Sequence, residues 1–303
     1  MKYQSITENV TIAYAPEERR TAENSAPFTI PITCIALNKE LVFVDCGIFV
    51  DVASDFRKEM ERKYNKPTSH LLLTHSDWDH IFAIEAFEDV NIVIGNPGIQ
   101  TIKKQLKDGY LSFEKRQEWA DRRYSDNKYM KNLIMNAHIF PPKMEIKNEF
   151  TIGKKDAQIL FKVIRGHSRD SSFVYNNTDK VLITGDNLLE CYPQLPGLPE
   201  DTMKTFALWE SLEIDYVIPG HGIVVDKEFV KKVRNYFEKL ILYLEEAIDN
   251  KRKIKHVLED DKLPSYFAIN RFNFELASRP NNNWIEMITK VWYNHLKRKK
   301  SKK

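Results

Sequence analysis

Four short apolar segments of the chain are each followed directly by a histidine or an aspartate. The segments are HLLLT (70–74), AQILFKVIRG (157–166), KVLITG (180–185) and YVIPG (216–220), followed by His75, His167, Asp186 and His221. Apolar runs of this kind, bounded by glycine and polar residues, are typical of buried strands. Because ligands of α/β proteins gather beyond the carboxyl ends of strands, the pattern predicts a fold that collects these side chains at one edge.

Helical segments alternate with the strands in the first part of the chain. Residues 50–64 have apolar side chains at helical spacing, between strands expected at 40–47 and 70–74. A second helix is expected at 81–89, followed by a strand at 90–97. This alternation favours a layered α/β fold.

Two long helical stretches interrupt or follow this alternation. Residues 98–138 are charged and mostly helical in pattern, which suggests a surface insertion, and residues 226–303 are a helical C-terminal extension. No Ser/Gly-rich linker divides the chain. We therefore expect one catalytic domain over 1–225, carrying the insertion, and a helical addition after it.

The positive charge of the chain is concentrated at its end. The formal net charge is +3, but the last seven residues, KRKKSKK, hold six basic side chains, so the body is slightly acidic. We expect a frayed, solvated tail, with contact to nucleic acid or anionic lipid as the less favoured alternative. The protein is expected to have no nucleic-acid partner, and a homodimer is left open.

The cysteine count and the hydropathy pattern indicate a cytoplasmic protein. The three cysteines form no CxxC pair, and an odd number argues against a disulfide framework. No apolar run approaches the roughly 18 residues of a membrane span. The first residues, MKYQSITENV, lack the apolar stretch of a secretory signal.

The richest cluster of metal-binding side chains follows the strand at 70–74. His75, Asp77, Asp79 and His80 lie within six residues, and His167, Asp186 and His221 complete a set of seven donors. Imidazole nitrogens and carboxylate oxygens bind divalent metals well. Seven donors exceed what one tetrahedral ion with an open position needs, so they suit two adjacent ions that share a carboxylate.

The order of these motifs resembles that of the metallo-β-lactamase superfamily, whose pattern is an early Asp, HxHxDH, a later His, a later Asp and a final His. Asp45 in VDCG, the cluster 75–80, His167, Asp186 and His221 match it over about residues 9–225. The resemblance implies a four-layer αββα sandwich. It also implies one metal held by His75, Asp77, His167 and Asp186 and another held by Asp79, His80, His221 and Asp186, with Asp45 supporting the cluster loop.

The sequence departs from the family pattern at Asp77, where the second histidine of HxHxDH is expected. Diiron flavoproteins of the superfamily use a glutamate at this place. A third carboxylate makes the site harder and favours iron or manganese over zinc. Three outcomes stay open: a two-metal site with iron or manganese, a two-zinc site with a weak first ion, or a site with one ion. Asp77 either binds the first ion or points away from it.

Substrate-contacting residues are less well marked. Arg169, in GHSRDSS, stands where hydrolases of the family often have a Pro-Gly turn, and Tyr192 lies in the loop after Asp186. Each is a candidate substrate contact, although an exposed arginine and a packed tyrosine are the simpler interpretations. We expect the insertion 98–138 and the loop 191–200 to form the walls of the pocket.

The leading functional hypothesis is a metal-dependent hydrolase. A hydroxide bound to the two divalent ions would attack a small-molecule ester, thioester, lactone or phosphoester, with Asp79 helping to orient the hydroxide. The alternative is a non-haem iron oxidoreductase, either a diiron reductase of O₂ or NO or a thiol dioxygenase. Residues 226–303 are expected to be too short and too helical to form a flavin-binding domain, which argues against the diiron form. A non-catalytic binding protein is the third hypothesis.

Overall fold

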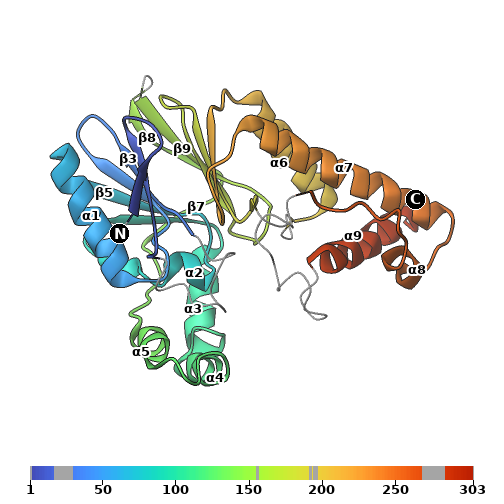
Figure 1. Ribbon diagram of the computed structural model, residues 1–303, viewed down its shortest axis with the longest axis horizontal. Helices are drawn as coiled ribbons and strands as arrows, with labels where there is room; N and C mark the ends of the chain where they lie inside the picture. The colour runs from blue at the N-terminus through green and yellow to red at the C-terminus, as the bar shows by residue number, and fades with distance from the viewer. Residues whose placement is uncertain are drawn as a thin grey trace.

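The computed structural model describes residues 2–16, 30–154, 157–190, 193, 197–267 and 284–302. Two β-sheets lie face to face, and helices cover the outer side of each (Figure 1). This is the four-layer α/β sandwich with a helical C-terminal part that the sequence predicts. In the described part of the chain, no helix has the length and apolar character needed to cross a bilayer.

The first sheet contains seven strands in sequence order. They are β1 (Lys2–Ser5), β2 (Val10–Tyr14), β3 (Ile32–Ala36), β4 (Leu41–Val44), β5 (Thr68–Leu73), β6 (Asn91–Gly95) and β7 (Met144–Ile146). The strands from β1 to β4 pair antiparallel, whereas those from β4 to β7 pair parallel. The carboxyl ends of β4 and β5 therefore meet at one edge, which places Asp45 beside the cluster that begins at His75.

The second sheet has five strands in the order β12-β11-β10-β9-β8. They are β8 (Glu149–Lys154), β9 (Ala157–Val163), β10 (Ser172–Asn176), β11 (Val181–Gly185) and β12 (Tyr216–Pro219). Only β11 and β12 pair parallel, and the intervening chain includes α6 (Pro199–Ser211). The parallel pairing brings Asp186 and His221, the residues after these two strands, to the same edge.

Alternating side chains of the strands enter different parts of the core. In β5, Leu72 faces the second sheet, whereas Leu71 and Leu73 face the helical layer that includes Phe56. Both faces of the strand are buried, so its sequence reads as a continuous apolar run rather than an alternating one. The strand ends are consequently held on both sides, which fixes the side chains that follow them.

Helices of different lengths cover the two sheets. The first sheet is covered by α1 (Val50–Tyr64), α2 (Trp78–Ile81) and the 3₁₀ helix η2 (Ile84–Phe87). The second is covered by α6 and α7 (Lys227–Asp249), and α8 (Ile254–Leu258) and α9 (Trp284–Lys300) belong to the same apolar cluster. The single helix expected at 81–89 is wrong: α2 ends at Ile81 and the 3₁₀ helix begins at Ile84, because the Ala83 backbone N–H donates to the Gly47 carbonyl oxygen and not to a partner within a helix.

The C-terminal basic residues are more ordered than expected. Lys299 and Lys300 lie in the last turn of α9 and form ion pairs with Glu200 of α6 and Asp249 of α7. The expectation of a frayed tail is therefore wrong for these residues. The physical reason is that acidic side chains on the neighbouring helices neutralise the end of α9, while Trp292 and Leu296 bury its apolar face.

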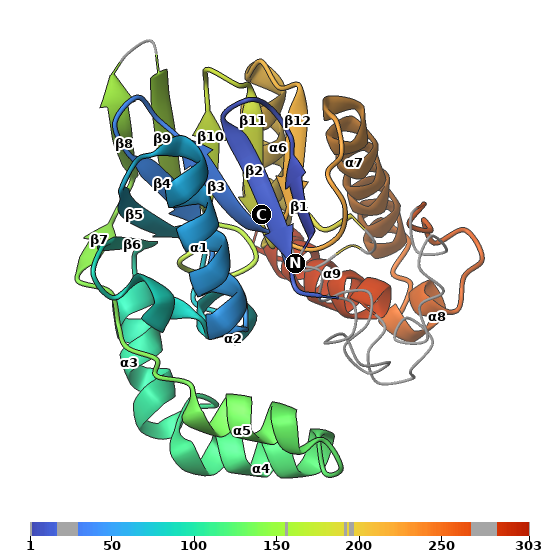
Figure 2. The same cartoon turned by 60° about the vertical axis from the view of Figure 1, so that its left-hand side comes forward.

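The segment between β6 and β7 projects from the sandwich as three helices (Figure 2). These are α3 (Gly98–Asp108), α4 (Phe113–Arg123) and α5 (Lys128–Asn136), with α4 packed on α5. We call this segment the arm. Its base lies beside α2 and the loop after β5, so the arm reaches the edge where the predicted site residues lie.

Candidate metal centre

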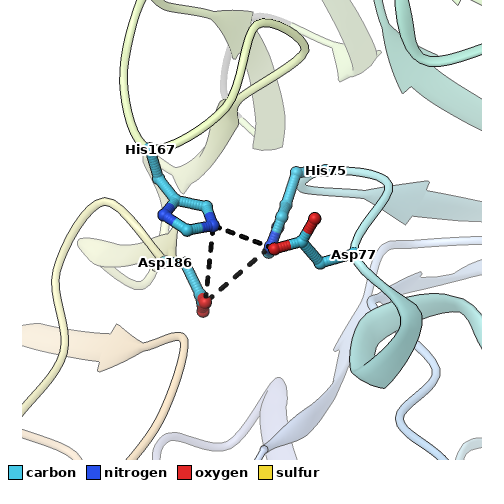
Figure 3. Close-up of side chains that lie close together, drawn as sticks. All are labelled: His75, Asp77, His167 and Asp186. Carbon is cyan, nitrogen blue, oxygen red and sulfur yellow. Dashed lines mark hydrogen bonds and ion pairs between the residues drawn. The ribbon is translucent and has the colours of Figure 1, made fainter. Parts of the chain in front are cut away.

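The first group of donors comes from both sheets. His75 and Asp77 follow β5, His167 lies between β9 and β10, and Asp186 follows β11. One donor atom from each lies within 4.8 Å of all the others, and the four side chains point toward one another (Figure 3). His75 Nε2 lies 3.6 Å from Asp77 Oδ2 and 3.8 Å from Asp186 Oδ2. Donors about 2.1 Å from one tetrahedral ion stand about 3.4 Å apart, so this spacing fits a metal site.

The second group lies directly beside the first. Donor atoms of Asp79, His80 and His221 again lie within 4.8 Å of one another. Asp186 contacts this group through its other oxygen: Oδ1 lies 3.1 Å from His80 Nε2 and 3.3 Å from His221 Nε2. The two oxygens of Asp186 thus face different groups, which is the arrangement of a carboxylate shared between two ions.

Asp77 points into the first group rather than away from it. Its Oδ2 lies 2.9 Å from His167 Nε2, and its side chain is 39 % exposed, whereas that of Asp186 is 4 % exposed. Burial would raise the pKa of the Asp77 carboxyl, but the imidazoles of His167 and His75 outweigh burial and hold that pKa well below its usual range. The carboxylate that distinguishes this sequence from the family pattern therefore stands at the solvent-facing side of the group.

Asp45 holds two histidines from behind. Its buried carboxylate accepts hydrogen bonds from the backbone N–H of Thr74 at 2.8 Å, from Thr74 Oγ1 at 2.8 Å and from His80 Nδ1 at 2.9 Å. Since the Thr74 hydroxyl donates to Asp45, it accepts from His75 Nδ1, which lies 3.0 Å away. Both imidazoles consequently carry a proton on Nδ1 and present Nε2 as the metal-binding nitrogen.

Two nitrogen atoms of this edge are buried without a hydrogen bond. Among the described residues, neither His75 Nε2 nor His80 Nε2 has a hydrogen-bond partner. A buried polar atom that lacks a partner is destabilising, by about 1–3 kcal/mol. Two divalent cations, one in each group, would satisfy both nitrogens, so the donor set fits the metals that the motifs imply.

Two glycines make room for the shared carboxylate. A Cβ atom at Gly220 would lie 2.1 Å from Asp186 Oδ1, and one at Gly185 would lie 2.6 Å from Thr74 Cβ. Gly185 also has a φ of +52°, a conformation that side-chain-bearing residues rarely adopt. The glycines beside the donors in TGD and PGHG are therefore steric requirements of this site.

The protonation of the metal-free donors follows from their mutual charges. Burial would lower the pKa of His221, but Asp186 and Asp79 outweigh burial and raise it to about 9. Asp186, Asp45 and Asp79 likewise outweigh burial and raise the pKa of His80, and Asp77 and Asp186 raise the pKa of His167. Burial would raise the pKa of Asp186, but His221 and His80 outweigh burial and lower that pKa well below its ordinary value. Without metal, the carboxylates and the protonated imidazoles therefore form ion pairs. A divalent cation would bind by displacing the imidazole protons.

Of the two residues predicted to contact substrate, only Arg169 lies in the described part of the chain, and it is not part of these groups. Arg169 is exposed, and it does not line the pocket beside Asp77. Tyr192 lies outside the described residues. Both assignments stay predictions.

A pocket beside Asp77 contains residues that the sequence did not single out as ligand contacts. Its volume is about 480 Å³, and its lining comprises Asp77, Trp78, Tyr110, Lys115, Glu118, Trp119 and Arg122. All but the first two belong to the arm, which agrees with the expectation that the insertion walls the pocket. The signal available in the sequence was the spacing of 115, 118, 119 and 122, which places these four on one face of α4.

Comparison with known proteins agrees with this architecture. A model of the metallo-β-lactamase superfamily matches residues 27–221. A sec-alkylsulfatase from Pseudomonas sp. has a similar structure, with a TM-score of 0.67 and 12 % identity over 96 % of this chain and 50 % of that one. A metallo-β-lactamase from Pontibacter korlensis gives a TM-score of 0.54 and 14 % identity over 78 % of this chain and 98 % of that one. The chain spans about half the length of the sulfatase. No curated protein matches the sequence significantly.

Proposed function

Because the chain belongs to the metallo-β-lactamase superfamily, we propose that it is a metal-dependent hydrolase of a small-molecule ester, thioester, lactone or phosphoester. The observation that carries the proposal is the position of Asp186, whose two oxygens face two adjacent groups of donors. If the histidines of these groups served only to stabilise loops, there would be no need for two adjacent groups of donors that share Asp186.

We assign His75, Asp77, His167 and Asp186 to one ion and Asp79, His80, His221 and Asp186 to the other. Two divalent ions bound there supply an ionised water and positive charge beside the oxygen on which negative charge develops. Asp45 orients His75 through Thr74 and His80 directly, so that both Nε2 atoms face the site. Buried glycine turns at 185 and 220 leave space for the Asp186 carboxylate.

The reaction adds water across the ester linkage. The water oxygen forms a bond to the acyl carbon or to phosphorus, the bond to the leaving oxygen or sulfur breaks, and the leaving group takes up a proton. Asp79 is buried, and its Oδ2 lies 3.4 Å from His221 Nε2. We assign this carboxylate the additional role of accepting a hydrogen bond from the attacking water, which orients it toward the substrate.

The donor set also bears on which metals are used. Asp77, Asp79 and Asp186 contribute three carboxylates, and oxygen-rich sites favour harder ions. Iron or manganese is therefore preferred over zinc in this proposal. Asp77 is also the observation that favours the second candidate, a non-haem iron oxidoreductase, since its carboxylate lies within the first donor group.

Elemental analysis of protein purified without added metal tests these alternatives. The hydrolase proposal expects manganese, iron or zinc, together with cleavage of nitrophenyl carboxylate, phosphate or sulfate esters that stops after treatment with a chelator. Two irons with a visible absorption band and no ester cleavage would support the oxidoreductase. Protein that binds no metal in metal-supplemented medium would refute both.

A pair of variants locates the activity. Asp186→Asn should remove metal and hydrolysis together, because it takes a charged donor from both groups. His256→Ala is the matched control, since this histidine is exposed on α8 and lies outside both groups. Equal metal content in the two variants would contradict the assignment.

A further inference from the structure

The pocket beside Asp77, which we call the arm pocket, opens from the first donor group. Asp77 belongs both to that group and to the pocket lining. The Tyr110 hydroxyl donates to the backbone carbonyl oxygen of Ser76 at 3.4 Å, which ties the arm to the loop that carries the donors. A molecule in the arm pocket therefore has one end at the proposed metal site. The arm pocket has a volume of about 480 Å³, which lies within the range of small-molecule sites, about 300–1,000 Å³.

The walls of the arm pocket are aromatic. The rings of Trp78 and Trp119 pack edge to face, with centroids 4.6 Å apart, and Trp119 also contacts Tyr124 and Phe82. Tyr110 completes the lining on the arm side. Indole and phenol rings that are fixed by such contacts offer flat apolar surfaces with little loss of side-chain freedom on binding. The walls therefore suit a flat apolar or aromatic group.

The outer rim of the arm pocket carries an unbalanced positive charge. Lys115 and Glu118 form an ion pair at 2.8 Å and neutralise each other. Arg122, one turn further along the same face of α4, is exposed and forms no ion pair within the described ranges. A guanidinium in this position favours a carboxylate or another planar anion.

We propose that the arm pocket binds the aromatic body of an organic anion, with the anionic group beside Arg122 and the hydrolysable ester beside Asp77. The identification of the scissile end rests on the proposed hydrolase function. The placement of the aromatic body and of the anionic group rests only on the aromatic walls and the charge of the rim. An organic cation would be repelled by Arg122, and a neutral molecule would gain nothing from it. The favoured substrate class is thus an aromatic carboxylate that carries an ester about one ring system away.

Binding of unreactive probes tests the pocket without any catalysis. The probes are 2-naphthoate, 2-naphthamide and 2-naphthylmethylamine, titrated by calorimetry into the full-length protein after metal removal with a chelator. We expect the naphthoate to bind about tenfold more tightly than the amide, as one charge-assisted contact implies, and the amine to bind most weakly. Equal affinities for the acid and the amide would overturn the proposal.

Variants identify the residues responsible. Arg122→Gln should abolish the preference for the acid over the amide, whereas Trp119→Ala should weaken both by about tenfold through the loss of the stacking surface. Lys104→Gln is the matched control, because it removes an exposed basic residue of α3 that does not line the pocket. Because Trp119 also packs within the arm, Trp119→Phe is tested in parallel and should restore most of the affinity. An unchanged preference in Arg122→Gln would refute the proposal.

A second measurement separates this inference from the hydrolase function. The metal-loaded protein is given the methyl esters of 2-naphthoate and of 6-carboxy-2-naphthoate. The proposal expects a lower KM for the carboxylated ester and about a tenfold increase of that KM in Arg122→Gln. If neither these esters nor the nitrophenyl esters are cleaved but the probes bind as expected, the hydrolase proposal fails and the arm pocket stands. If both are cleaved with equal KM, the arm pocket fails and the hydrolase proposal stands.

Discussion

Asp45 Oδ2 lies 2.9 Å from His80 Nδ1, on the side of the imidazole that faces away from the two donor groups. Asp45 has a φ of +54°, an unusual backbone conformation for a residue with a side chain. The turn after β4 thus directs the carboxylate back toward the loop after β5. This contact connects the turn after β4 to α2 and determines which nitrogen of His80 is available to a metal.

Replacing Asp45 by asparagine should weaken metal binding while the protein still folds. An amide has one acceptor oxygen for three donors, so at least one of the contacts to Thr74 and His80 is lost. We expect metal affinity to fall about 10–100-fold and the free energy of unfolding to fall by about 1–3 kcal/mol. Chelator competition and urea unfolding measure the two effects.

The control for this variant is Asp226→Asn. Asp226 caps α7 by accepting a hydrogen bond from the Phe229 backbone N–H at 2.8 Å, and asparagine caps helices equally well. If the Asp45→Asn and Asp226→Asn variants bound metal with equal affinity, this result would contradict the role given to Asp45.

Replacing Asp77 by histidine should change metal preference. The variant restores a third imidazole to the first donor group and removes one carboxylate, so zinc should be retained more strongly relative to manganese or iron. Elemental analysis after growth with equal concentrations of the three metals provides the measurement. Metal ratios identical to those of the unmodified protein would place Asp77 outside the coordination shell.

Metal uptake should release protons, and metal affinity should rise with pH. The pKa of His221 is raised to about 9 because Asp186 and Asp79 outweigh the effect of burial, so the metal-free imidazole is protonated at neutral pH. A cation must displace that proton, and the competition ends only above the raised pKa. Affinity should therefore increase from pH 6 to pH 9. Titration calorimetry in two buffers of different ionisation enthalpy counts the protons, and heats that are equal in both buffers would refute this expectation.

Glu200 should stabilise the docking of α9 at neutral pH and cease to do so in acid. Burial would raise its pKa, but Lys299, the Glu200 backbone N–H and His295 outweigh burial and lower the pKa to about 2. A lowered carboxyl pKa gives stability that is present above the ordinary value of 4.5 and is lost as the pH falls toward 2.

The corresponding variant is Glu200→Gln. Because the Glu200 side chain is 35 % exposed, we expect a loss of only about 0.5–1 kcal/mol at pH 7, and a smaller difference at pH 3. Urea unfolding at the two pH values provides the test, with Glu286→Gln as the control, since Glu286 forms an ion pair with Lys290 within α9. A loss that grew in acid would contradict the assignment.

The main strands and the seven donors could be read from the sequence because both leave strong local signals. Segments such as HLLLT are largely apolar, since the sheets are buried on both faces, and each candidate donor stands at the end of such a segment or within six residues of it. Strands β1 and β7 were not predicted. Their sequences, KYQS and MEI, are short and lie at the two edges of the first sheet, where no buried face imposes a pattern.

The arm pocket shows what the sequence could not provide. Lys115, Trp119 and Arg122 lie on one face of α4, but an exposed helix face looks the same whether it meets solvent or a site. Their proximity to Asp77 depends on how the arm is oriented relative to β5, which contacts such as that between Tyr110 and Ser76 determine. The orientation of Asp77 was likewise undetermined until His167, 90 residues later in the chain, was placed beside it.

The position of Asp186 between the donor groups has a mechanical consequence for the whole sandwich. The clusters join the loop after β5 in one sheet to the ends of β11 and β12 in the other. Ions bound there would act as cross-links between two layers that otherwise touch through apolar side chains and through hydrogen bonds such as that from the Ser172 backbone N–H to the Thr74 carbonyl oxygen. Chelation would then do more than end the chemistry. It would weaken the contact between the two sheets, and the unfolding temperature would fall as the metal content falls.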